Sequence, residues 1–226
     1  GTIWISAATA GLNYYDPKVV KFEHFAKTPV NNNSLSDNTV WAIFEDIEQN
    51  VWIGTENGLN KFDPKTGFFE HFFSETGNSN SLSGNQIVSI CEDASGELWF
   101  GTRSGLNRYN KKTKRFRQYL TSNQSNNTVA SGVVWSLYLD KSNTLWVRTT
   151  AGLFKYNPQN DNFTGYFNNP NDSTSISDNS ICCMYETKSG ELWIATYLGG
   201  INKIIRQGDE LKFKRYLFDP DDPNSI

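Results

Sequence analysis

The residues that could perform acid–base chemistry recur in phase along this chain of 226 residues. Asp46, Asp93 and Asp140 follow one another at intervals of 47 residues, and Glu45 and Glu92 stand directly before the first two. One active site needs one acid and one base, so a catalytic pair of carboxylates should occur once and not in every copy. A recurring Asp opens a turn through its side-chain oxygen. The pattern therefore predicts a structural role for these carboxylates and no catalytic residue.

The histidines and cysteines show no spacing typical of a metal or redox centre. His24 and His71 fall at the same position of a repeating pattern, and we expect them to be solvated surface groups. Cys182 and Cys183 are adjacent and Cys91 stands alone, without a C-x-x-C spacing. We expect the cysteines to be small buried hydrophobes, and we predict no metal and no cofactor.

Composition and charge favour an all-β protein without a nucleic-acid partner. Aromatic residues make up 14% of the chain, enough for a packed core, while Met occurs once. The formal net charge is −3, and no stripe of Lys and Arg indicates a nucleic-acid-binding face. No apolar run approaches the ~20 residues that span a bilayer, so we predict no direct membrane insertion.

A repeat built around tryptophan organises the whole chain, residues 1–226, as one domain. The copies align on Trp4, Trp52, Trp99, Trp146 and Trp193, at intervals of 48, 47, 47 and 47 residues. Each tryptophan is followed by a glycine and an aliphatic residue, at Gly11-Leu12, Gly58-Leu59, Gly105-Leu106, Gly152-Leu153 and Gly200-Ile201. Five copies in phase identify a repeat protein.

Each repeat predicts four short antiparallel strands. The first strand is apolar on both faces and is expected to be buried on both, at 40–45, 87–92, 134–139 and 181–186. The tryptophan strand runs back from it, and the glycine that follows is expected to supply the positive φ of the next hairpin turn. The last strand alternates apolar and polar residues, as in 69–72 and 116–119, which is typical of a half-solvated outer strand.

A four-stranded antiparallel sheet repeated at this interval predicts a β-propeller. The chain holds four complete blades and three strands of a fifth, because it begins at a tryptophan strand. We expect it to be part of a larger ring in preference to a closed five-bladed one.

The repeat resembles the two-component regulator propeller repeat. The resemblance rests on residues 93–110, which read DASGELWFGTRSGLNRYN, and on the phased Asn-Ser-Leu-Ser at Asn80–Ser83 with Asn85 after it. It implies the periplasmic sensor half of a hybrid two-component histidine kinase of the Bacteroidetes type, with seven-bladed propellers that sense oligosaccharides. Arg148, Ala195 and Ser6 depart from it by replacing the motif glycine, and Phe154 replaces an asparagine.

Candidate ligand-binding residues are those that break the repeat near the rim of a propeller. Proteins bind sugars through amides that hydrogen-bond to the hydroxyls, an aromatic face for stacking, and Arg for carboxylate or sulfate groups. The positions that offer these groups are Trp41, Trp135, Arg103, Arg148, Tyr197, Asn38, Asn85 and Asn179. An alternative for Trp41 and Trp135 is packing between blades. Arg148 is expected either to reach solvent or to pair with an acid.

Two functions remain open from the sequence. The first is a non-enzymatic, periplasmic module that binds an oligosaccharide for a membrane-bound kinase. The alternative is a protein–protein interaction or dimerisation propeller, whose rim binds another protein and no small-molecule ligand. With either function, further propeller blades or a second copy of the chain are expected as partners. A propeller lyase or hydrolase would need catalytic residues that the sequence does not offer.

Overall fold

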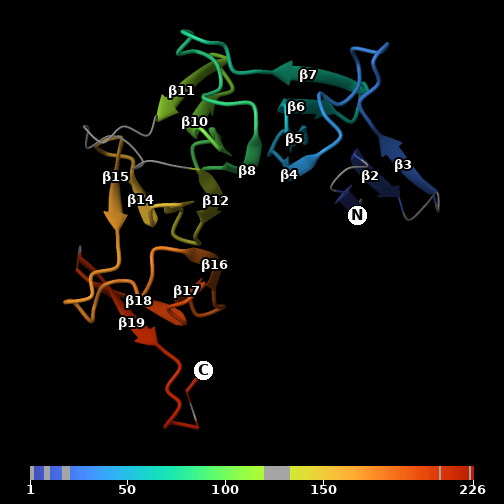
Figure 1. Cartoon of the computed structure of the whole chain (residues 1–226). Helices are drawn as coiled ribbons and strands as arrows, with labels where there is room; N and C mark the ends of the chain where they lie inside the picture. The colour runs from blue at the N-terminus through green and yellow to red at the C-terminus, as the bar shows by residue number, and fades with distance from the viewer. Residues whose placement is uncertain (1–2, 8–10, 17–20, 120–132, 209, 224) are drawn as a thin grey trace. The chain divides into compact units, whose positions relative to one another are not determined.

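The computed structural model describes residues 3–7, 11–16, 21–119, 133–208, 210–223 and 225–226. Regular structure within these ranges is entirely β-strand, and no helix there could span a membrane. The strands form five antiparallel sheets, one of three strands and four of four strands (Figure 1). The prediction of an all-β chain of propeller blades is confirmed, including the three-stranded first blade.

The blades follow one another along the sequence, and each keeps its strands in chain order. Blade 1 contains β1 (Ile3–Ala7), β2 (Gly11–Asp16) and β3 (Lys21–Phe25). Blade 2 contains β4 (Val40–Glu45), β5 (Val51–Thr55), β6 (Gly58–Asp63) and β7 (Phe68–Phe72). Blade 3 contains β8 (Ile87–Glu92), β9 (Leu98–Thr102), β10 (Gly105–Asn110) and β11 (Arg115–Tyr119).

The last two blades have the same strand order. Blade 4 contains β12 (Val134–Leu139), β13 (Leu145–Thr149), β14 (Leu153–Asn157) and β15 (Asn162–Tyr166). Blade 5 contains β16 (Ile181–Glu186), β17 (Leu192–Thr196), β18 (Ile201–Gln207) and β19 (Glu210–Tyr216). The chain divides into two compact units, residues 1–120 with 133–137, and residues 121–132 with 138–226. Each unit is described by itself below.

The hairpin turns have the backbone conformation that the sequence predicts. The glycine that opens the third strand has a positive φ in all five copies: Gly11 (82°), Gly58 (115°), Gly105 (145°), Gly152 (149°) and Gly200 (66°). An L-residue with a Cβ rarely adopts such angles, so glycine is required by the turn itself.

The core of the first unit lies between neighbouring blades. Trp52 of blade 2 is 1% exposed, and its ring centroid lies 5.6 Å from that of Phe100 and 5.7 Å from that of Tyr109, both in blade 3. In the second unit Trp146 of blade 4 belongs to one cluster with Ile194 and Phe213 of blade 5. A blade therefore buries its apolar face against the next blade, as repeat proteins must.

The first strand of each blade is not buried on both faces, and this prediction was wrong. Every residue of β5 and β9, the tryptophan strands, is buried. In contrast, β4 exposes Trp41 and β16 exposes Cys182 and Cys183. First strands are edge strands with one hydrogen-bonded neighbour, whereas the tryptophan strands have one on each side. The cysteines were predicted to be buried, and this holds for Cys91 alone.

Asparagine side chains fasten the connecting loops that precede blades 2, 3 and 5 to those blades. The Asn60 Oδ1 atom accepts the backbone N–H of Ser36 at 2.8 Å, and its Nδ2 atom donates to Ser36 Oγ at 2.9 Å. Asn107 makes the same two bonds to Ser83, and Asn202 makes them to Ser177. These asparagines are fully buried. They anchor the ends of these connecting loops, just before the first strands begin.

The histidine position has a structural partner as well. His71 is half-buried, and its Nε2 atom lies 2.7 Å from the carbonyl oxygen of Ser34. Gln118 and Arg215 occupy the same position and donate to the carbonyls of Ser81 and Ser175 at 2.8 Å. The expectation of a solvated group is therefore revised for His71, because the side chain holds the connecting loop.

Candidate functional site

In blades 2, 3 and 5 the turn after the tryptophan strand is held against the start of the first strand of the same blade. The backbone N–H of Glu56 donates to Thr39 O at 2.9 Å, and that of Arg103 donates to Gln86 O at 3.3 Å. In the second unit Tyr197 N donates to Ser180 O at 2.9 Å. Glu56, Arg103 and Tyr197 thus occupy equivalent places, and all three side chains are exposed. We call this edge of each unit its rim.

An irregularity in the first strand turns a second set of side chains outward. The pairing of β4 with β5 shifts register between Val40 and Ala42, so Trp41 has no cross-strand partner. The same shift leaves Val88 unpaired in β8 and Cys182 unpaired in β16. An extra residue of this kind interrupts the alternation of a strand and re-aims its side chain. This explains why 48% of the Trp41 surface is exposed.

The carboxylate of Glu56 links Trp41 of blade 2 to Gln86 at the start of blade 3. Its indole Nε1 donates to Glu56 Oε2 at 2.7 Å. The other carboxylate oxygen of Glu56 accepts a hydrogen bond from Gln86 Nε2, at the start of blade 3. Glu56 therefore fixes the orientation of the exposed indole while bridging two blades.

Trp135 lies at the other end of the same rim, in the part of β12 that belongs to the first unit. The guanidinium carbon of Arg103 lies 5.4 Å from the Trp135 ring centroid, a cation–π arrangement. Trp135 is 39% exposed, and Arg103 is also exposed. Five residues on this rim contact one another in turn, and we call them the Trp41–Trp135 row: Trp41, Glu56, Gln86, Arg103 and Trp135.

The row brings together three of the predicted site residues, Trp41, Arg103 and Trp135. Both tryptophans are partly exposed, and their role as ligand contacts or as packing between blades stays a prediction. Glu56 and Gln86 were not predicted as site residues. Glu56 lies at a turn position that varies between the repeats, and this variation could have identified it. Gln86 lies just before the first strand, where the other repeats have Thr39 and Ser180, and its residue type gave no indication of a role.

The three predicted asparagines lie at the ends of the connecting loops and close them. The Oδ1 atoms of Asn38, Asn85 and Asn179 accept the backbone N–H groups of Lys27, Ser74 and Asn168, at 2.7, 2.6 and 2.7 Å. In each case the partner is eleven residues earlier in the chain. This accounts for asparagine at these positions without a ligand, and their ligand-binding role stays a prediction.

Arg148 and Tyr197 belong to the second unit. Arg148 replaces the motif glycine on β13, and its Nη1 atom donates to the backbone carbonyl of Cys182 in blade 5. From the sequence we expected Arg148 either to reach solvent or to pair with an acid, whereas its observed partner is this backbone carbonyl. The Arg148 Nε atom is buried and has no hydrogen-bond partner among the described residues. Tyr197 is 72% exposed at its rim position.

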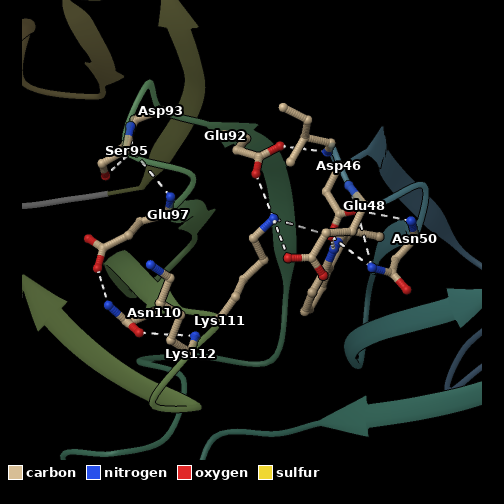
Figure 2. A network of polar contacts seen from close by, with 12 residues as sticks. Asp46, Glu48, Asn50, Glu92, Asp93, Ser95, Glu97, Asn110, Lys111 and Lys112 are labelled. Atoms are coloured by element: carbon tan, nitrogen blue, oxygen red, sulfur yellow. Dashed lines mark hydrogen bonds and ion pairs between the residues drawn. The ribbon is translucent and has the colours of Figure 1, made fainter.

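The recurring carboxylates form a polar network between blades 2 and 3 (Figure 2). Lys111 Nζ lies 2.6 Å from Glu92 Oε1, 3.5 Å from Glu48 Oε1 and 3.7 Å from Asp46 Oδ2. The second oxygen of Glu92 accepts the backbone N–H of Ile47 at 2.9 Å. In the second unit Arg206 takes the place of Lys111 and lies 3.2 Å from Asp140. These groups join blade to blade, which supports the structural role predicted for them.

Hydrogen bonds determine the ionisation of the buried aspartates. Burial opposes the charged form of Asp46, but the Trp52 indole at 2.8 Å, the Asn50 amides and Lys111 outweigh it, so the pKa of Asp46 lies below its ordinary value. The pKa of Asp140 is lowered against burial by Ser142, the Trp146 indole, Thr144 and Arg206. Each Asp receives the indole N–H six residues later, a coupling that the sequence argument missed.

Comparison with known proteins identifies the repeat. Residues 34–57, 81–104 and 175–198 match the family model of the two component regulator propeller, as the sequence predicted. No curated protein matched the chain. The matched segments contain the first two strands of blades 2, 3 and 5, together with the Ser-Leu-Ser or Ser-Ile-Ser loop before them.

Solved structures with the same fold include two extracellular domains from B. thetaiotaomicron. That of a proposed hybrid two component system is 25% identical with a TM-score of 0.72, covering 100% of this chain and 28% of that one. That of a proposed one component system is 25% identical with a TM-score of 0.71, covering 95% and 26%. The chain thus spans about a quarter of the length of these domains.

A bacterial lyase shares the fold at lower identity. Virginiamycin B lyase from Staphylococcus aureus is 16% identical with a TM-score of 0.64, covering 99% of this chain and 68% of that one. At this identity the likeness extends to the propeller fold alone, and it carries no statement about catalysis in this chain.

Proposed function

We propose that this chain, three of whose blades match the two component regulator propeller, is part of the extracytoplasmic, ligand-sensing portion of a membrane-bound sensor. Its Trp41–Trp135 row binds an oligosaccharide, and the chain itself performs no catalysis. The observation that carries the proposal is the pair of exposed tryptophans with a carboxylate, an amide and a guanidinium between them.

The chemistry of the row suits a sugar chain. Sugar rings stack their C–H faces on exposed indoles, and Trp41 and Trp135 are 48% and 39% exposed. Gln86 and Glu56 offer amide and carboxylate groups to hydroxyls, while Arg103 offers planar N–H donors to a carboxylate or sulfate. A row with one charge of each sign favours a ligand that is mainly neutral with few acidic groups.

The relatives support an extracytoplasmic place for the chain. Both B. thetaiotaomicron matches at 25% identity are extracellular domains of proposed signalling proteins. A periplasmic location follows for this chain if it belongs to a protein of that kind. Further blades complete the propeller around it, and a kinase elsewhere in the protein transmits the signal.

The first test is a panel of neutral and acidic oligosaccharides, measured by isothermal titration calorimetry with the 226-residue protein. Trp41→Ala and Trp135→Ala are each expected to weaken binding at least about tenfold, because aromatic anchors dominate such contacts. Phe68→Ala is the matched control, since Phe68 is 60% exposed on the outer strand β7. It is expected to bind like the unchanged protein.

Two outcomes contradict the proposal. Binding that survives both tryptophan substitutions places the ligand elsewhere. No binding to any glycan, together with a dimer that grows with concentration in analytical ultracentrifugation, favours the protein-interaction propeller instead.

A further inference from the structure

The two charged residues of the Trp41–Trp135 row differ in how far the protein itself satisfies them. Each carboxylate oxygen of Glu56 already accepts a hydrogen bond, one from Trp41 Nε1 at 2.7 Å and one from Gln86 Nε2. The guanidinium of Arg103 has no hydrogen-bond acceptor and no carboxylate partner among the described residues, and its neighbour is the ring of Trp135. The row therefore holds an acid whose oxygens have partners and a base whose N–H donors are free.

Other arginines of the chain use their guanidinium groups to join parts of the structure. Arg206 lies 3.2 Å from Asp140, and Arg215 donates to the carbonyl oxygen of Ser175 at 2.8 Å. Arg103 differs, because its backbone N–H holds its turn in place while its side chain is exposed. The fold therefore does not need the positive charge of Arg103.

The blade pattern does not require Arg103 or Trp135 either. The turn position of Arg103 holds Glu56 in blade 2 and Tyr197 in blade 5, and the strand position of Trp135 holds Val88 in blade 3. Arg103 and Trp135 belong to blades 3 and 4, and each of these blades has another blade before it and after it in the chain. Neither residue thus lies on a terminal blade.

The pair has the chemistry to bind a sugar that carries a negative charge. The N–H donors of a guanidinium lie in one plane, so contact with one ring cannot occupy all of them, and two donors together match a carboxylate or sulfate group. Trp135 keeps 39% of its surface exposed with the guanidinium carbon 5.4 Å from its ring centroid. One acidic sugar can therefore contact Arg103 through its anionic group and the indole through its ring.

We propose that Arg103 and Trp135 form a subsite for an anionic sugar at one end of the row. The ligand is then an acidic oligosaccharide, with its carboxylate or sulfate at Arg103 and its uncharged sugars extending towards Trp41. This inference rests on the proposed function, because it assigns the charge and direction of a ligand bound to the same row. Carboxylate and sulfate groups share the chemistry that a guanidinium recognises.

The test uses pairs of oligosaccharides that differ only in charge, measured by isothermal titration calorimetry. Oligogalacturonates are compared with their methyl esters for the carboxylate, and κ-carrageenan oligosaccharides with their desulfated forms for the sulfate. Any other acidic glycan that binds is compared with its carboxyl-reduced or desulfated form. In at least one pair the acidic member should bind at least about ten times more tightly than the neutral one, as a charge-assisted hydrogen bond provides. This preference should shrink between about 50 and 500 mM NaCl, because salt screens exposed charges.

Three variants locate the charge and the direction of the ligand. Arg103→Gln should weaken binding of the acidic member at least about tenfold and leave binding of the neutral member unchanged. Trp41→Ala should weaken both members by the same factor, because Trp41 contacts the uncharged sugars. Arg115→Gln is the matched control, since it removes the same charge from an exposed side chain on the outer strand β11 and should keep the preference.

The outcomes separate this subsite from the proposed function. Equal binding of acidic and neutral members, or a preference that survives Arg103→Gln, overturns the subsite and leaves the sugar-binding row in place. Equal weakening of both members by Arg103→Gln also overturns it, because Arg103 is then a contact that does not read charge. Absence of binding to every glycan contradicts the proposed function and the subsite together.

Discussion

Blade 3 and blade 4 share the motif tryptophan and its bonded aspartate but differ at one position of the third strand and one of the fourth. Blade 3 uses polar groups, since Asn107 is fully buried and bonded to Ser83, and Gln118 donates to Ser81. Blade 4 has Phe154 and Gly165 at the corresponding positions. The Phe154 ring packs edge-on against Phe167 with centroids 5.5 Å apart.

The departures in blade 4 depend on one another. A Cβ on Gly165 would lie 2.6 Å from Cζ of Phe167 and 3.0 Å from Cε1 of Phe154, so the observed ring positions leave no room for a larger residue there. A residue that breaks the repeat is therefore not functional for that reason alone. In contrast, the rim residues Trp41 and Arg103 break the repeat and are exposed.

The position of the motif glycine on the tryptophan strand also differs between the two units, at the interface with the next blade. A Cβ on Gly101 of blade 3 would lie 2.8 Å from Cγ1 of Val134, and one on Gly54 of blade 2 would lie 2.7 Å from Ile87 O. In blade 4 the same position holds Arg148, which reaches the Cys182 carbonyl. In the first unit the first strand of the next blade lies too close to the motif glycine for a side chain to fit. In the second unit the same position accommodates an arginine.

The largest expected effect comes from exchanging these two residues. Gly101→Arg should destabilise the protein by about 3 kcal/mol or more, because it forces a long side chain against a close-packed strand. Arg148→Gly should cost only about 1 kcal/mol, the value of its bond to Cys182. Urea unfolding followed by tryptophan fluorescence measures both. Equal effects of the two substitutions would contradict the difference between the interfaces.

The indole–aspartate bond provides the next contrast. Asp46→Ala should cost about 2.5 kcal/mol, because it leaves the buried Trp52 N–H without its acceptor and Lys111 without one of its partners. Blade 5 has Thr187 at the equivalent position, and Thr187→Ala should cost less than about 1 kcal/mol. The same urea experiment applies, and a Thr187 effect as large as that of Asp46 would show that the carboxylate is not special.

The polar residues of blade 3 and the aromatic pair of blade 4 at these positions should differ in their sensitivity to substitution. Asn107→Ala should cost about 2 kcal/mol, because the Ser83 N–H and the Phe100 carbonyl lose their partner. Gly165→Ala in blade 4 should cost about 1 kcal/mol, because the Phe167 ring is 45% exposed and can turn away. Thermal unfolding distinguishes the two. A larger effect at Gly165 would mean that the Phe154–Phe167 pair is rigid.

The smallest effect concerns acid pH. Asp46 and Asp140 have folded-state pKa values below the ordinary value, so their contribution to stability is present above the unfolded pKa of about 3.9 and disappears as the pH falls through the folded value. Asp46→Asn and Asp140→Asn should therefore flatten the decline of Tm between neutral pH and about pH 2. An unchanged slope in both variants would show that these groups do not control the acid limb.

The strand order and the bounds of the first strands were predictable from the sequence, because a blade is a local structure. The first strands 40–45, 87–92, 134–139 and 181–186 fall where the apolar runs predicted them. Burial was less predictable, because it depends on which strands have neighbours on both sides. Of the residues that the structure brings together in the Trp41–Trp135 row, Trp41, Arg103 and Trp135 were singled out from the sequence, while Glu56 and Gln86 were not.

By itself the sequence determined the repeat, the four-strand blade and the scaffold role of the recurring aspartates, since each depends on residues within one period. The tertiary structure decided which of the residues that vary between repeats are exposed and which contact the neighbouring blade. Glu56 meets Gln86 across 30 residues of sequence, and Arg148 meets Cys182 across 34. Such contacts arise where one blade lies against the next, and the register shift that exposes Trp41 and Cys182 has no signature in residue type. Only the folded arrangement of strands shows them.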